Sequence, residues 1–286
     1  MKPSIERDLK GRQEALVTRL SELGSLVVAF SGGVDSSFLL AVAAQVLGDR
    51  VLAVTAVSVI HPEREKQEAV RFTSERGIEH ILLPSREMEL PEFVSNNPDR
   101  CYHCKRSILD QVSGIARERG IPHVAHAANA DDHLDYRPGG RAAQEAGALA
   151  PLIEVGLKKA AIRTLSKEMG LSCWDKPSMA CLASRIPYGE SITVEKVKMV
   201  EEAENRLLDA GFSQVRVRCH SRVARIEVNA SDMEKLMLPD LRARIVEDLR
   251  GLGFLHVALD MEGYTTGSLN RAIEKQTAED KLPRRR

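Results

Sequence analysis

The feature that most constrains this chain is a short glycine- and serine-rich turn between an apolar run and a helical pattern. Residues 26–30 are apolar and predict a buried strand, and residues 38–47 predict a helix. The turn between them reads Ser31-Gly-Gly-Val-Asp-Ser-Ser37. Such a turn points backbone N–H groups and hydroxyls at the positive end of a helix dipole, and its glycines let an anion approach the main chain. The chain is therefore predicted to bind phosphate here.

The same turn indicates which kind of phosphate site to expect. It lacks the lysine that follows the glycines in the Walker pattern, which disfavours kinase-like transfer of a terminal phosphate. The string resembles the PP-loop of the N-type ATP pyrophosphatases, which cleave ATP to AMP and pyrophosphate while adenylating a substrate oxygen. A functionless glycine/serine loop is the alternative, which the order of strand, loop and helix disfavours. The resemblance implies an ATP site formed by Ser31, Gly32, Gly33, Asp35, Ser36 and Ser37.

Strands and helices continue to alternate after this turn. This alternation predicts an α/β fold, with a parallel sheet covered by helices on both faces. Ligands of such sheets bind at the carboxyl ends of the strands. Ser58, which follows the second predicted strand, is therefore either an adenine contact or a structural turn hydroxyl. The predicted strands are residues 51–57, 79–83 and 123–127, and the predicted helices are residues 5–23, 62–76 and 107–119.

The pattern changes near residues 175–190, in a loop that contains proline and cysteine. We therefore expect a PP-loop domain over residues 1–180 and a small α+β domain over residues 181–286, which would serve substrate binding or oligomerisation. Within the second domain, the predicted helices are residues 193–210 and 241–250. The predicted strands are residues 215–219, 223–228 and 254–259, and the alternation in the first two predicts that they are half-exposed.

Composition limits the partners and the compartment. The 286 residues include 41 basic and 41 acidic side chains, so net charge gives no electrostatic reason to expect nucleic acid as the main partner. No apolar stretch is long enough for a membrane span, and the charged N-terminus lacks a signal-peptide apolar region. We expect a cytoplasmic protein, in which five cysteines serve metal, redox or nucleophilic chemistry or are simply buried.

Three of the cysteines carry candidate chemistry. Cys101 and Cys104 form a C-x-x-C pair, which alone could be a zinc half-site, an iron–sulfur half-site, a redox pair or two buried thiols. Cys181 lies in the loop at the expected domain junction, where a thiolate could act as nucleophile or sulfur donor, and we expect Lys176 and Arg185 to lower its pKa. The remaining two, Cys173 and Cys219, are interpreted as structural.

Carboxylates and arginines complete the candidate residues. Asp131, Asp132 and Asp135 follow the fourth strand and could orient Mg²⁺ or only cap the next helix. Arg216 and Arg218 alternate on one strand face, which suits a phosphate or carboxylate ligand, or else a solvated face with cross-strand charge pairs.

Taken together, these motifs resemble the LarE family of PP-loop sulfur transferases over nearly the whole chain. The resemblance implies that ATP adenylates a carboxylate of pyridinium-3,5-biscarboxylic acid mononucleotide and that sulfur then displaces AMP, in the synthesis of the nickel-pincer nucleotide cofactor. It also implies a homo-oligomer. The segments that carry the resemblance are Ser31-Gly-Gly-Val-Asp-Ser36, Thr55-Ala-Val-Ser58, Arg100-Cys-Tyr-His-Cys-Lys105, Asn129-Ala-Asp-Asp132, Asp135-Tyr-Arg-Pro-Gly139, Asp175-Lys-Pro-Ser-Met-Ala-Cys-Leu-Ala-Ser-Arg185, Val215-Arg-Val-Arg218 and Ala224-Arg-Ile-Glu227.

The family obtains sulfur in two ways. In one form a single cysteine, matching Cys181, gives up its sulfur and becomes dehydroalanine. In the other form three cysteines hold a 4Fe-4S cluster, whose open iron carries a sulfide taken from a sulfide donor. Because Cys101, Cys104 and Cys181 fill all three positions, the resemblance favours the cluster form. We further expect substrate contacts from Arg185, Arg216 and Arg218 and Mg²⁺ ligands among Asp35, Asp131 and Glu227.

Three other functions fit parts of the pattern. A PP-loop tRNA sulfur transferase also combines this loop with three cysteines, but the zero net charge disfavours it. An ammonia-dependent amide synthetase would leave the cysteines without a role. A zinc-stabilised nucleotide sensor would not consume ATP in the presence of a substrate.

Overall fold

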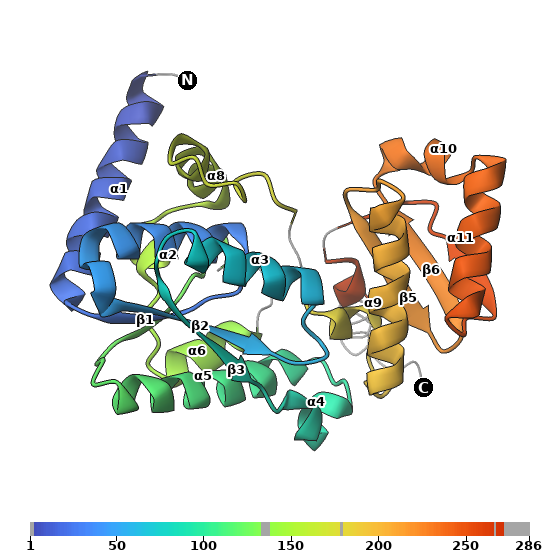
Figure 1. The fold of residues 1–286 in the computed structure, drawn as a ribbon, viewed down its shortest axis with the longest axis horizontal. Helices are drawn as coiled ribbons and strands as arrows, with labels where there is room; N and C mark the ends of the chain where they lie inside the picture. The colour runs from blue at the N-terminus through green and yellow to red at the C-terminus, as the bar shows by residue number, and fades with distance from the viewer. Residues whose placement is uncertain (1–2, 133–137, 178–179, 266, 272–286) are drawn as a thin grey trace, which may run out of the picture. The chain divides into compact units, whose positions relative to one another are not determined.

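The computed structural model describes residues 3–132, 138–177, 180–265 and 267–271, and the chain divides into two compact units, each with its own sheet (Figure 1). The first unit comprises Met1–Phe93 and Asp99–Met179, and the second comprises Val94–Pro98 and Ala180–Arg286.

The sheet of the first unit is parallel throughout, and its strand order is β3-β2-β1-β4. The predicted α/β fold with a parallel sheet is therefore confirmed. β1 lies inside the sheet, so the turn that follows it opens at the carboxyl edge between two neighbouring strands. The strands are β1 (Leu26–Ala29), β2 (Val51–Val57), β3 (Glu79–Pro84) and β4 (Val124–His126).

Both faces of this sheet are covered by helices, because alternate residues of its buried strands point to opposite sides. Leu26 and Val28 join the core formed with α2, whereas Val27 joins a second core with Val112 and Ala116 of α5. Figure 1 shows α2 and α3 on one face and α5 on the other. The α-helices of this unit are α1 (Pro3–Leu23), α2 (Val34–Leu47), α3 (Glu63–Ser74), α4 (Pro91–Val94), α5 (Arg100–Glu118), α6 (Pro138–Glu145), α7 (Pro151–Glu154) and α8 (Lys159–Glu168).

Two helices begin at least four residues earlier than predicted. α5 begins at Arg100, whereas the pattern predicts a start at residue 107. The first two turns of the helix are polar, so they give no apolar period, and the buried apolar residues Leu109, Val112 and Ala116 lie further along. α2 begins at Val34 instead of residue 38, with Asp35 in its first turn, where a negative charge is favourable. The cysteine pair and half of the phosphate turn are therefore helical.

The second unit is an α+β arrangement around a mixed sheet of order β5-β6-β7, in which β5 and β6 are antiparallel and β6 and β7 are parallel. The prediction that the first two strands are half-exposed is wrong for β5, which is buried along most of its length because helix α9 packs on it. The main elements are α9 (Val194–Asp209), β5 (Val215–His220), β6 (Val223–Val228), α10 (Met233–Leu236), α11 (Pro239–Gly251) and β7 (His256–Leu259).

A five-residue segment from the middle of the sequence, Val94–Pro98, also belongs to the second unit. Asn96 is fully buried in the left-handed conformation (φ +58°), and its Nδ2 lies 3.2, 2.7 and 2.8 Å from the carbonyl oxygens of Ile186, Pro187 and Glu190. One side-chain amide thus connects this segment to the loop that follows Cys181.

Candidate active site

The phosphate turn between β1 and α2 is held together by its own hydroxyls. The Oγ atoms of Ser31 and Ser36 lie 3.0 Å apart, and the Ser36 hydroxyl donates to the Gly33 carbonyl at 3.1 Å. Gly32 has a φ of +70°, and a Cβ there would lie 3.3 Å from the Cβ of Ala69 on α3. The turn therefore needs glycine at position 32, both for its conformation and for its close packing against α3.

The first turn of α2 presents polar groups beside this loop. Ser36 and Ser37 are buried, and the Ser37 hydroxyl has no hydrogen-bond partner among the residues that the structure describes. The Gly33 backbone is extended, and α2 supplies the positive end of a fourteen-residue helix. This arrangement of N–H groups and hydroxyls is suited to an oxyanion.

Asp35 joins the loop to two elements distant in the sequence. Its Oδ2 accepts hydrogen bonds from Lys159 Nζ at 2.8 Å and from Asn129 Nδ2 at 3.2 Å. Its Oδ1 is buried and has no partner in the described part of the chain. An unsatisfied carboxylate oxygen beside a phosphate loop fits a Mg²⁺ ion, which prefers oxygen ligands. Sequence reasoning assigned no role to Lys159.

The aspartates after β4 make loop hydrogen bonds. Asp131 Oδ2 accepts the backbone N–H of Lys159 at 2.8 Å, and Asp132 Oδ2 accepts that of Asn129 at 3.0 Å. Asp131 thereby helps to place Lys159 beside Asp35, while Asp135 lies outside the described residues. Across the described ranges, no group of three or more His, Cys, Asp or Glu side chains is close enough to hold a metal ion.

Ser58, at the end of β2, is engaged by a residue that sequence reasoning missed. Its hydroxyl donates to Glu87, which lies in a short 3-10 turn after β3 and is fully buried. Ser58 Oγ also lies 3.4 Å from His61 Nδ1, and burial lowers the pKa of His61 although Glu87 opposes the shift. Ser58 thus organises the loop after β2, and its hydroxyl proton already has an acceptor.

The three candidate cysteines belong to different units. Cys101 and Cys104 lie one turn apart on α5, with Cys101 exposed, whereas Cys181 immediately precedes the short 3-10 turn Leu182–Arg185 of the second unit. The three-cysteine site therefore stays a prediction. Burial lowers the pKa of Lys105, which follows Cys104, and burial with the charge of Lys105 lowers the pKa of His126 to about 4.

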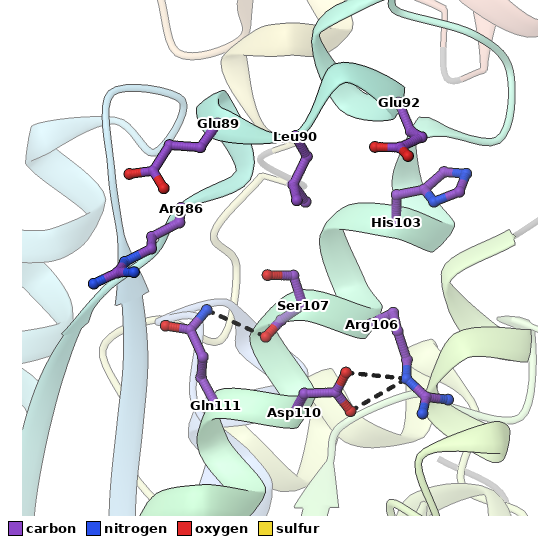
Figure 2. Close-up of a pocket in the computed structure, with 9 residues that line it drawn as sticks. All are labelled: Arg86, Glu89, Leu90, Glu92, His103, Arg106, Ser107, Asp110 and Gln111. Carbon is purple, nitrogen blue, oxygen red and sulfur yellow. Dashed lines mark hydrogen bonds and ion pairs between the residues drawn. The ribbon is translucent and has the colours of Figure 1, made fainter.

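A broad pocket of about 800 Å³ lies on α5 beside the cysteine motif (Figure 2). In Figure 2, Arg106 points toward Asp110, and the Arg106 Nε lies 3.2 Å from its carboxylate. His103 of the C-x-x-C segment lines the pocket, but neither cysteine does. The lining residues are Arg86, Glu89, Leu90, Glu92, His103, Arg106, Ser107, Asp110 and Gln111.

The predicted substrate arginines form a buried charge network in the second unit. Arg185 donates from Nε and Nη2 to the two carboxylate oxygens of Glu204, both at 2.8 Å. Arg218 forms the same two-pronged pair with Glu227 at 2.9 and 2.8 Å. Burial, together with the charge of Arg185, lowers the pKa of Arg216 to about 10. The solvated sheet face of the alternative is wrong, because Arg216 and Arg218 are buried, but its cross-strand charge pair is present between Arg218 on β5 and Glu227 on β6.

Lys176, which was expected to act on Cys181, contacts the phosphate turn at residues 31–37 and two glutamates of α3. Its Nζ lies 3.2 Å from the Gly32 carbonyl oxygen and 2.5 and 2.6 Å from carboxylate oxygens of Glu65 and Glu68. Burial lowers the pKa of Lys176, but the two glutamates outweigh it and raise the pKa. Arg185, the other cation expected to act on the Cys181 thiol, is paired with Glu204.

Known proteins are similar in sequence to this chain over most of its length. The family model described as NAD synthase matches residues 13–134, which contain the phosphate turn and all four strands of the parallel sheet. An uncharacterized protein of Synechocystis is 40% identical over 93% of this chain and 100% of its own length. The pyridinium-3,5-bisthiocarboxylic acid mononucleotide synthase of Lactiplantibacillus plantarum is 34% identical over 93% of this chain and 96% of its own length. The chain belongs to the LarE family.

Membership of this family confirms the predicted superfamily and enzyme class. This LarE protein is an ATP-using sulfur transferase with a PP-loop domain. Relatives extend to an uncharacterized protein of Methanocaldococcus jannaschii, which is 24% identical over 84% of this chain and 90% of its own length. Among the described helices, none is both long and apolar enough to cross a membrane.

Proposed function

We propose that this LarE protein converts pyridinium-3,5-biscarboxylic acid mononucleotide to its thiocarboxylate in the synthesis of the nickel-pincer nucleotide. The observation that carries the proposal is the full-length match to a synthase whose name states the bisthiocarboxylic product. In the first step a substrate carboxylate oxygen attacks the α-phosphorus of ATP, and pyrophosphate leaves. In the second step sulfur attacks the acyl-adenylate carbon, and AMP leaves.

The first step is assigned to the loop of the first unit. The N–H groups and hydroxyls at residues 31–37 would bind the phosphates, and Lys159, 2.8 Å from Asp35, would supply a positive charge as pyrophosphate departs. Asp35 Oδ1, buried without a partner among the described residues, would take part in binding Mg²⁺. Asp131 and Glu227 stay predicted Mg²⁺ ligands, of which Asp131 already bonds the Lys159 backbone and Glu227 already bonds Arg218.

For the sulfur step, Cys101, Cys104 and Cys181 would hold a 4Fe-4S cluster, with a sulfide donor as partner. All five cysteines are described and none is in a disulfide, and Cys101 and Cys104 lie at i and i+3 of one helix, a spacing that fits two ligands of one cluster. When bound, such a cluster supplies a sulfide for transfer. The alternative, in which Cys181 gives up its own sulfur, needs neither Cys101 nor Cys104.

Substrate binding is assigned to the buried arginines. The buried arginines lie in one network with Glu204 and Glu227, which Arg225 and Asp260 extend, so the network counts four positive against three negative side chains. A substrate phosphate or carboxylate would balance that excess, and arginine suits both groups because its planar donors match two oxygens at once. Assembly into a homo-oligomer and a cytoplasmic location stay predictions from the sequence.

The proposal is tested by anaerobic purification, cluster reconstitution and a count of iron and sulfide, on wild type and on Cys101→Ala. The reaction is followed by pyrophosphate release and by the mass of the thiocarboxylate. We expect iron in the wild type, its loss in the variant, and pyrophosphate release that requires the dicarboxylate. An iron-free wild type that still transfers sulfur, with Cys181 lighter by one H₂S, would establish the sacrificial route. Absence of pyrophosphate release with the dicarboxylate would contradict the proposal as a whole.

A further inference from the structure

A chain of three side-chain hydrogen bonds crosses the parallel sheet from α3 to the residue that precedes the phosphate turn. Thr73 Oγ1 on α3 lies 3.0 Å from His80 Nδ1 on β3, and His80 Nε2 lies 2.8 Å from Thr55 Oγ1 on the neighbouring strand β2. Thr55 in turn donates to the carbonyl oxygen of Phe30 at 2.8 Å. All four residues belong to the first unit, and both threonines are buried, so water competes little for these bonds.

The last bond of this chain fixes the peptide that opens the phosphate turn. β1 ends at Ala29, and the Thr55 hydroxyl holds the carbonyl oxygen of the next residue, Phe30. In a planar trans peptide, the C=O and the following N–H point in opposite directions. The Ser31 N–H is therefore turned away from β2, and it lies 3.3 Å from Ser36 Oγ. Because Ser31 and Ser36 belong to the turn proposed to bind the phosphates, Thr55 sets the direction of its first N–H donor.

The proton positions along the chain follow from its acceptors. Thr55 has one hydroxyl proton, and it goes to the Phe30 carbonyl oxygen, which can only accept. Thr55 Oγ1 must then accept from His80, so the ring proton lies on Nε2. Burial lowers the pKa of His80 and favours the neutral ring, in which Nδ1 accepts from the Thr73 hydroxyl. That hydroxyl also lies 3.1 and 2.9 Å from two carbonyl oxygens of its own helix, which are its alternative acceptors.

We propose that Thr55 and His80 are positioning residues for the nucleotide: His80 orients the Thr55 hydroxyl through its Nε2–H, and Thr55 holds the peptide that opens the phosphate turn. The inference rests on the proposed function, because it takes from it the assignment of the ATP phosphates to residues 31–37. Both side chains act through the carbonyl of Phe30. The Ser31 N–H is thus oriented before the nucleotide arrives, so binding does not have to order this peptide, and affinity is gained.

The test uses the full chain, with Mg²⁺ and the α,β-methylene analogue of ATP, whose binding is measured by calorimetry. Thr55→Val removes the hydroxyl and nearly keeps the shape of the side chain, so the analogue should bind about tenfold more weakly. Thr55→Ser keeps the hydroxyl and should bind within about twofold of the wild type. His80→Phe keeps the ring contact with Phe30, at 5.8 Å between centroids, and removes both nitrogens. The analogue should bind this variant about threefold more weakly, because nothing then orients the Thr55 hydroxyl.

Two further measurements separate positioning from loss of stability. Val112 is fully buried in the core on the α5 side of the same sheet. Val112→Ala should lower the urea midpoint at least as much as Thr55→Val does, because it leaves a cavity, yet it should bind the analogue as the wild type does. The ring of His80 is observed separately by long-range ¹H–¹⁵N NMR of the wild type at neutral pH, and it should be neutral and protonated at Nε2.

Each contrary result is distinct. Wild-type affinity in Thr55→Val, or equal loss of affinity in Thr55→Ser, would overturn the role of Thr55. Equal weakening of the analogue by Val112→Ala would reduce the effect to lost stability and overturn positioning as its cause. A His80 ring protonated at Nδ1, or wild-type affinity in His80→Phe, would overturn the role of His80. Failure of the wild type to bind the analogue at all would instead contradict the ATP site of the proposed function, and the inference with it.

Discussion

Replacing Glu204 by glutamine should lower stability and strengthen anion binding in the second unit at the same time. Arg185 is fully buried and donates to both carboxylate oxygens of Glu204 at 2.8 Å, and Glu204 Oε1 also accepts the Val217 N–H at 2.9 Å. Glutamine keeps the shape and one acceptor oxygen but removes the charge. Loss of one partner from a buried ion pair typically costs about 3–5 kcal/mol, because the other charge stays buried without compensation. We expect the free energy of unfolding to fall by this amount.

The same substitution changes the charge of the arginine network. Arg185, Arg216, Arg218 and Arg225 against Glu204, Glu227 and Asp260 give four minus three, or one excess positive charge, and loss of the Glu204 charge gives four minus two, or two. A bound anion then compensates more charge. Since a ligand that binds only the folded state stabilises it by mass action, inorganic phosphate should stabilise Glu204→Gln more than the wild type.

Native-state hydrogen exchange of the β5 amides measures this effect in the second unit, with and without phosphate. The control is Lys196→Met, which breaks the pair of Lys196 Nζ with Glu190 (3.0 Å), whose side chains are 25% and 30% exposed. A partly exposed pair of this kind should be worth less than about 1 kcal/mol. Equal effects of Glu204→Gln and Lys196→Met, or equal stabilisation of Glu204→Gln and wild type by phosphate, would refute the reasoning.

Other parts of the structure give further expectations. Lys159→Met should lower kcat/KM for pyrophosphate release about 100-fold, because it removes a charge placed for the leaving group, while the exposed neighbour Lys158→Met should change it little. Gly32→Ala should cost about 1–2 kcal/mol of unfolding free energy, measured in urea, because φ is +70°; an unchanged midpoint would contradict this. Burial lowers the pKa of His126 from 6.5 to about 4, so the neutral imidazole stabilises the folded state. This contribution to the free energy of unfolding is complete above pH 6.5 and is lost as pH falls toward 4. His126→Gln should flatten that part of the stability profile, and an unchanged slope would contradict the burial argument.

The parts of this fold that follow from local pattern could be predicted from the sequence. Apolar runs separated by helical periods identified the strands of the parallel sheet, and the glycines identified the turn after β1. The start of α5 could not be found in this way, because residues 100–106 lie on an exposed or half-buried part of the helix apart from Arg100. Helix starts are least visible where no apolar side chain marks the buried face.

The contacts that define the site depend on chain segments far apart in the sequence. Lys176 reaches Gly32 across 144 positions, Lys159 reaches Asp35 across 124, and Glu87 reaches Ser58 across 29. Each of these side chains looks like an ordinary surface charge in the sequence, because its burial and its partner are fixed only by tertiary packing. The sequence pattern therefore located the phosphate turn and Ser58, but it did not identify the charged side chains that contact them.

The segment that carries Asn96 limits how this protein can be divided. A fragment that starts at residue 180 lacks the amide that satisfies three carbonyl oxygens of the loop at residues 186–190. Exchange of the C-terminal unit between relatives by a single crossover would pair that loop with a segment inherited from the other parent. The two stretches of sequence are therefore expected to be inherited together, as one module encoded in two pieces.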